Sequence, residues 1–536
     1  MRGKTPTLQA MSQSIHPIFQ RFSEWKTLAL LCAASFFLLD IVPALSPEAG
    51  FSFSFIAFME FIVLAQLAFA WRIRLGSLPI SSIYILTSLY FFRLVYRASL
   101  GLTALWGMRG GWIHTPLLGL VWYGVGTLML HPDAYREIER YSRIVGEWPN
   151  GKKRFYTAVF FVLLTALFFA LQSRNISRDG LDWIERSTKP VWHLYMREPL
   201  TIGLHRLLYL LVRPFFHVRN DMAVSFQIFP ILSIAAGLWS GFWFLKIVRL
   251  AWRGNVDRVL ACLLAAASGG WMILNFGHVE VYPILIAGLL PTFYFAQRYL
   301  GGQGSILPAA VGFSLTFLLH LSVGWLIPAF GLLPFMQKER KKIFPDVIVF
   351  GTTFLAIQSV FWLSLLVFCY GSDPSRMLAR LHEDFNVGPD RAMFLPGWAL
   401  LQGRHLWDLL NEAIYLSPPC LLLFPLALAI LVRRLKKENL FWMLLAAGYL
   451  AYTFLWNPDR GYPEDWDLFS PGVPIAVFFL LHIYLPATET EAQLHPNRLN
   501  IYLAAMGTLP YAIAQILYHR LIPFSRAGFP WIDSSI

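Results

Sequence analysis

Long apolar runs recur from one end of the chain to the other, and this feature constrains the fold most. A run of about 18 or more apolar residues can cross a hydrocarbon layer of about 30 Å as a helix. Of the 536 residues, 57% are hydrophobic and only 14% are charged, whereas soluble domains carry about a quarter charged residues. The sequence therefore predicts an all-α polytopic membrane protein with about 13–15 transmembrane helices.

The expected spans follow directly from the apolar runs. They lie near 27–45, 51–70, 78–96, 115–131, 155–172, 222–248, 257–275, 280–298, 305–320, 322–336, 346–369, 413–432, 439–456, 468–485 and 499–518. Lys and Arg gather in alternate loops, and cytoplasmic loops carry the excess of these residues. This pattern predicts a cytoplasmic N-terminus; the expected location, the bacterial inner membrane, follows instead from the resemblance to a bacterial family given below. The net charge of +13 is then explained by topology, and no nucleic-acid partner is expected.

Three parts are expected along the chain. They are an N-terminal four-span module (1–154), a membrane core (155–485) with outer loops at 173–221, 370–412 and 457–467, and a C-terminal span and tail (486–536). No Walker-type phosphate loop is present in the sequence, which argues against an activity driven by the chain's own nucleotide hydrolysis.

The loop 173–221 carries more polar chemistry than a connector needs. Asp179 and Asp182 stand three positions apart, and a carboxylate held near an acceptor hydroxyl can act as a general base. Cations at the bilayer surface can hold a phosphodiester and stabilise a leaving phosphate. The candidates for this role are Arg178, Arg186, Lys189, Arg197 and Arg206. The alternative is an ordinary solvated loop with an Asp-Gly turn.

The segment after Pro199 has one apolar and one basic face. Leucines share it with His205, Arg206 and Arg213, a pattern typical of an amphipathic helix that lies in the membrane interface. The loop therefore predicts carboxylates held next to the bilayer beside a row of cations.

Histidines and a glutamate stand where spans end on the same outer side. His278, Glu280 and Tyr282 belong to a short turn between two spans, and ionisable groups at membrane depth indicate function by default. We expect them, together with His320 and His405, to contact substrate. The alternatives are a polar turn capped by its own side chains and structural histidines bonded to neighbouring carbonyls.

An acidic segment precedes the span at 468–485. Glu464, Asp465 and Asp467 are candidates for binding substrate or a divalent metal (Mg²⁺ or Mn²⁺), because both ions prefer oxygen ligands. Asp467 could instead cap the helix that follows it.

These features resemble the GT-C superfamily of polytopic membrane glycosyltransferases, and the likeness covers about residues 155–485. It rests on the acidic loop after a span, the helix after Pro199, and the motifs at 196–200, 277–282 and 464–469. The resemblance implies a catalytic core that moves a sugar from a polyprenyl-phosphate donor to a hydroxyl of a glycan, lipid or protein acceptor. It also implies inversion at the anomeric carbon, an Asp base and an extracytoplasmic active site. In many members the acidic loop follows the first span, whereas here it follows the fifth expected span, so four additional spans precede that one.

Two other functions remain open from the sequence. An O-antigen ligase or polymerase would use Arg and His rather than a carboxylate base. A transporter or flippase of lipid-linked substrates would place charges at mid-membrane in broken helices.

Overall fold

The computed structural model describes residues 132–173, 178–189, 196–216, 220–336, 340–385, 394–433, 437–458, 465–486 and 491–521. Within these ranges the chain is helical, and an isolated bridge between Phe394 and Trp456 is the one β-type pairing. The spans expected near 27–45, 51–70, 78–96 and 115–131 lie outside the described residues.

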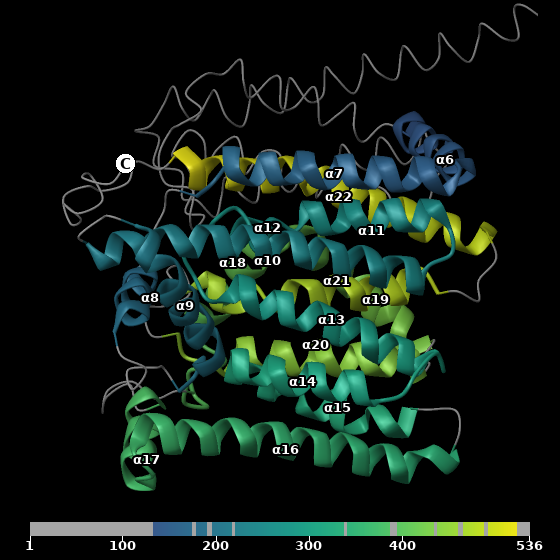
Figure 1. Cartoon of the computed structure of the whole chain (residues 1–536). Helices are drawn as coiled ribbons and strands as arrows, with labels where there is room; N and C mark the ends of the chain where they lie inside the picture. Colours follow the sequence, from purple (N-terminus) through teal and green to yellow (C-terminus); the bar gives the residue numbers. More distant parts are fainter. Residues whose placement is uncertain are drawn as a thin grey trace, which may run out of the picture.

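The helices follow one another with short connections. In chain order they are α6 (Pro132–Glu147), α7 (Asn150–Ala170), α8 (Arg178–Thr188), α9 (Pro199–Val212), η4 (Arg213–Phe215), α10 (Asp221–Ala251), α11 (Asn255–Ala267), α12 (Gly269–Leu274), α13 (Tyr282–Leu300), α14 (Leu307–Leu319), η5 (Leu321–Leu326), α15 (Ile327–Leu332), η6 (Leu333–Met336), η7 (Arg340–Lys342), α16 (Ile343–Tyr370), α17 (Pro374–Phe385), α18 (Gly403–Leu416), α19 (Pro418–Arg433), α20 (Lys437–Leu455), η8 (Trp466–Phe469), α21 (Gly472–Tyr484) and α22 (Glu491–Leu521). The longer ones run roughly side by side, with α7 and α16 on opposite sides and α8, α9 and α17 at one end (Figure 1).

The expected all-helical membrane architecture is present. By length and composition, four helical stretches of the described residues can cross a membrane: Asn150–Ala170, Asp221–Ala251, Ile343–Tyr370 and Trp466–Tyr484. A fifth is added if the bent pair Asp408–Leu416 and Pro418–Leu428 forms one span. Shorter apolar helices occupy Leu307–Leu319, Leu321–Met336 and Asn439–Leu455. The span expected at 257–275 is divided between α11 and α12, which meet at Ser268.

The spans differ in how much of their surface the protein itself covers. Only 6% of the most apolar window of α7 and 11% of that of α16 is buried, against 56% for α10 and 89% for the stretch Trp466–Tyr484. Helices that expose apolar surface all round suit contact with lipid tails, whereas α10 and α21 form the inside of the bundle.

Small residues allow the helices of the core to approach closely. A Cβ on Gly237 of α10 would lie 2.6 Å from the side chain of Asn275, and one on Gly312 of α14 would lie 2.7 Å from the hydroxyl of Thr292. Thr292 also lies within hydrogen-bond distance of Thr316 across the α13–α14 contact, at 3.2 Å between the hydroxyl oxygens. Small residues and shared hydroxyls are the usual basis of helix packing in lipid.

A helix begins at Pro199, as the sequence predicts, and Pro occupies its favoured first position. Leu207, Leu210 and Leu211 of α9 are exposed, which fits a helix lying against lipid. The placement of His205 on a basic outer face was wrong. Its side chain is buried and stacks on Phe229 with ring centroids 4.0 Å apart, because position 205 follows Thr201 and Ile202 on the face that packs against α10.

Candidate functional site

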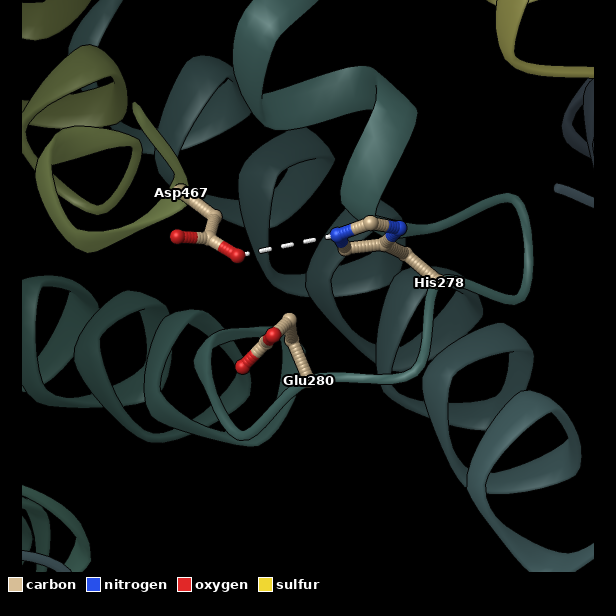
Figure 2. Close-up of side chains that lie close together, drawn as sticks. All are labelled: His278, Glu280 and Asp467. Atoms are coloured by element: carbon tan, nitrogen blue, oxygen red, sulfur yellow. Dashed lines mark ion pairs between the residues drawn. The ribbon is translucent and has the colours of Figure 1, made fainter. Parts of the chain in front are cut away.

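Three ionisable side chains from two distant parts of the chain meet inside the protein. We call His278, Glu280 and Asp467 the polar cluster; they are 2%, 3% and 6% exposed. Their ligand-type atoms all lie within 4.8 Å of one another, and His278 Nε2 is 3.6 Å from Asp467 Oδ2. Figure 2 shows the three side chains pointing toward one another from the turn before α13 and from η8.

Burial lowers the pKa of His278 to about 4, because charging an imidazole away from water is unfavourable. Its ring is therefore neutral near pH 7. A neutral imidazole beside two carboxylates can accept protons, orient sugar hydroxyls or bind a cation.

The turn that carries His278 and Glu280 is shaped by its own sequence. Gly277 has a φ of +75°, a conformation that glycine adopts without steric cost. The Ser173 amide donates a hydrogen bond of 2.6 Å to the Phe276 carbonyl, which ties the turn to the end of α7. Tyr282 then begins α13, and Pro283 lies in the first turn of this helix. The turn is thus held on both sides before its polar groups reach the cluster.

Asp467 reaches the polar cluster from a short 3-10 helix. Asp467 lies within η8 rather than before it, and the Ser470 amide donates to its carbonyl. Its side chain therefore faces His278 and does not cap the following helix. Asp465 is also buried, whereas Glu464 lies outside the described residues.

A hydrogen bond joins the acidic loop to the polar cluster. The indole nitrogen of Trp183 in α8 donates to Glu280 Oε2 at 2.9 Å, and both side chains are buried. Asp182, one position earlier, is exposed, and nothing is described of the Asp179 side chain. The two predicted bases thus belong to helix α8, which contacts the cluster through Trp183, and the choice of base stays a prediction.

A second buried pair lies at the start of α9. Glu198 Oε1 is 3.1 Å from His320 Nε2, and the Ser322 amide donates to His320 Nδ1 at 3.1 Å. Because Nδ1 accepts this bond, the ring carries its proton on Nε2, facing the carboxylate. The Tyr282 ring lies 5.4 Å from that of His320. Three of the residues predicted to contact substrate, His278, Tyr282 and His320, are thus arranged around α13.

Two predicted phosphate-binding cations lie near one buried carboxylate. Asp384 of α17 accepts a hydrogen bond of 2.7 Å from the Met196 amide. Burial raises the pKa of Asp384, opposed by that amide and by the charges of Arg380, Arg186 and Arg197. The segment that carries Arg197 is also held by its own carbonyl, which accepts from the Leu321 amide at 2.9 Å. This end of the bundle is therefore rich in positive charge.

The other predicted cations and His405 have local partners. Lys189 pairs with Glu185 on the surface, and Arg206 donates to the Ser187 carbonyl at 3.0 Å. His405 Nε2 lies 3.1 Å from the Phe454 carbonyl, which connects α18 to α20 and does not place it in the polar cluster. The Arg178 side chain lies outside the described residues.

The sequence reasoning missed several buried polar groups beside the cluster. Glu412 of α18 is 1% exposed, and neither of its carboxylate oxygens has a hydrogen-bond partner among the described residues. His519 of α22 shares a 2.6 Å hydrogen bond with the Tyr415 hydroxyl, and its ring lies 6.1 Å from that of His278. The available signal for His519 was an ionisable residue that follows a long apolar stretch, whereas the amphipathic sequence of α18 gave no such signal for Glu412.

The comparisons with known proteins give a likeness of fold. No family model matches the chain, and no curated protein matches it. The chain is similar to a crystal structure of ArnT from Cupriavidus metallidurans in the apo state, with a TM-score of 0.46 and 12% identity over 69% of this chain and 78% of that chain. It is also similar to ArnT bound to undecaprenyl phosphate, with a TM-score of 0.47 and 12% identity over 68% of this chain and 77% of that one. A likeness at this level of identity concerns the fold alone, and no functional residue is transferred from it.

Proposed function

We propose that this integral membrane protein transfers a sugar from a polyprenyl-phosphate donor to an acceptor hydroxyl at the extracytoplasmic face, with inversion at the anomeric carbon. The observation that carries the proposal is the hydrogen bond between Trp183 and Glu280. It connects α8, which carries Asp179 and Asp182, to a buried group of polar side chains, and this contact supports the proposal of a base on α8 and of sugar binding at the polar cluster.

In the proposed reaction Asp179 or Asp182 takes the proton of the acceptor hydroxyl. The oxygen of the acceptor attacks the anomeric carbon, and the bond from that carbon to the phosphate oxygen breaks. The electron pair leaves with the polyprenyl phosphate. Arg186 and Arg197 stabilise the charge that develops on this phosphate, and the polar cluster orients the sugar through its hydroxyls. Glycan, lipid and protein hydroxyls are all acceptors to be tested.

Release of free polyprenyl phosphate by the full chain in lipid nanodiscs tests the proposal. The donors are radiolabelled undecaprenyl-phosphate sugars, because undecaprenyl phosphate is the lipid in one of the similar structures. The variants are Asp179→Asn and Asp182→Asn, and Asp221→Asn is the control. Asp221 lies in the same outer loop and pairs with Arg213 on the surface, so it undergoes the same chemical change away from the cluster.

We expect one of the two Asn variants to lose turnover by a factor of at least about 100, the usual contribution of a general base, while it still binds the donor. The control keeps wild-type turnover. If both variants turn over normally, Asp179 and Asp182 are not the base. If the wild type binds donor without releasing polyprenyl phosphate, the transporter becomes the better explanation.

A further inference from the structure

We propose that His278, Glu280 and Asp467 bind one divalent transition-metal ion, of the Mn²⁺ or Zn²⁺ kind. The proposal goes beyond the transferase reaction and does not depend on it, because it rests on these side chains alone. It differs from the oxygen-only site that the sequence predicts at Glu464, Asp465 and Asp467, because it includes an imidazole from another part of the chain.

The geometry fits a single ion with small adjustments. Protein nitrogen and oxygen ligands lie about 2.0–2.2 Å from Zn²⁺, so two ligands on opposite sides of such an ion are at most about 4.4 Å apart. The ligand atoms of the cluster lie within 4.8 Å of one another, and the pair His278 Nε2 and Asp467 Oδ2 is already at 3.6 Å. Rotamer shifts of a few tenths of an ångström bring all three into range.

The imidazole of His278 makes no hydrogen bond among the described residues. Its ring is 2% exposed, and neither ring nitrogen has a hydrogen-bond partner there. Buried polar atoms in proteins nearly always have such a partner. A nitrogen that points at a buried carboxylate from 3.6 Å, too far for a hydrogen bond, leaves room for an ion between the two.

Negative charge gathers around the same point. Glu412 lies close enough to Asp467 and to Asp465 for their charges to interact, and all three side chains are buried. A divalent cation stabilises carboxylates that lie close together away from water. The indole of Trp183 donates a hydrogen bond to one oxygen of Glu280. In known metal sites, residues around the ligands orient them through hydrogen bonds of this kind.

The donor set selects the kind of metal. Imidazole nitrogen suits Zn²⁺ and other transition metals, whereas Mg²⁺ and Ca²⁺ prefer oxygen alone. One imidazole with two carboxylates therefore favours Mn²⁺ or Zn²⁺ over Mg²⁺ and Ca²⁺. The Mn²⁺ ion is paramagnetic, so it also serves as the probe.

The test uses the full chain in detergent, stripped with EDTA, dialysed and titrated with Mn²⁺ alone or, in a parallel sample, with Zn²⁺ alone. Bound metal is counted by elemental analysis, and the nitrogen ligand is detected by electron spin-echo spectroscopy of Mn²⁺. The variants are His278→Asn and Asp467→Asn. The control is His482→Asn, because His482 is a half-buried histidine whose Nδ1 lies 2.8 Å from the Phe478 carbonyl of its own helix.

We expect about one equivalent of Mn²⁺ in the wild type and in the control, with a nitrogen coupling that disappears in His278→Asn. Both cluster variants bind at least about tenfold more weakly. Asp467→Asn keeps the size of the side chain, so it tests the charge even if His278→Asn folds poorly. Absence of bound Mn²⁺ and Zn²⁺ in the wild type overturns the proposal, as does a nitrogen coupling that survives His278→Asn. A wild type that turns over but binds no metal in the titration would refute the metal site and leave the proposed transferase function standing. A wild type that binds metal but does not turn over would support the metal site and contradict the transferase function.

Discussion

The substitution Trp183→Phe removes the indole N–H that connects the acidic loop to Glu280. The bond is 2.9 Å long, and its acceptor is a buried carboxylate. A hydrogen bond to a charged group contributes about 1.5–3 kcal/mol. If the bond positions α8 over the polar cluster, about 2 kcal/mol is lost from the transition state, which corresponds to roughly a 30-fold lower kcat/KM. The measurement is release of polyprenyl phosphate in nanodiscs together with the thermal unfolding midpoint.

Trp252→Phe is the matched control for this prediction. Trp252 is also buried, and its indole donates to the Leu485 carbonyl at 3.0 Å. A bond to a neutral carbonyl contributes about 0.5–1.5 kcal/mol, and this one lies outside the polar cluster. We expect the control to lower stability and leave turnover per folded molecule unchanged. Equal losses of turnover in the two variants would refute the positioning role of Trp183.

Two further substitutions separate stability from function. Arg498→Met leaves Asp257 buried without the guanidinium that now bonds both of its oxygens, at 2.6 and 3.1 Å. We expect a loss of about 3–5 kcal/mol, visible as a lower unfolding temperature, with Mn²⁺ binding of the folded fraction unchanged. Gly277→Ala places a Cβ 2.7 Å from Gln172 in a left-handed turn, whereas Gly302→Ala meets open space at a similar φ. Both cost about 1–2 kcal/mol in backbone strain, but a fall in turnover is expected only for Gly277→Ala.

Within the described residues, the apolar runs predicted the positions of two long helices closely. Span 346–369 corresponds to α16 (Ile343–Tyr370), and span 222–248 lies inside α10 (Asp221–Ala251). This works because lipid requires every backbone group to be bonded within the helix. The break between α11 and α12 was not predicted, because Ser268-Gly269-Gly270 continues an apolar run without a proline or a charge.

The sequence predicted the segments that form the site but not their assembly. The sequence singled out the segments of His278, Glu280 and Asp467, since charges next to apolar runs are rare, but it could not place these segments together. Contacts between parts of the chain so far apart depend on how α12 packs against η8 and α22, which no local pattern records. Glu412 was missed for a different reason. It sits in a helix with ordinary amphipathic spacing, where a carboxylate reads as a solvated residue.

Assembly of the polar cluster from two distant segments has a consequence for how the protein is made. During synthesis His278 and Glu280 enter the membrane long before Asp467 leaves the ribosome. Until the C-terminal helices arrive, these two polar groups must remain near the water interface, because isolated ionisable groups are expelled from hydrocarbon. The three side chains of the polar cluster can therefore meet only after the segment that carries Asp467 has been synthesised and has packed against the turn 275–281.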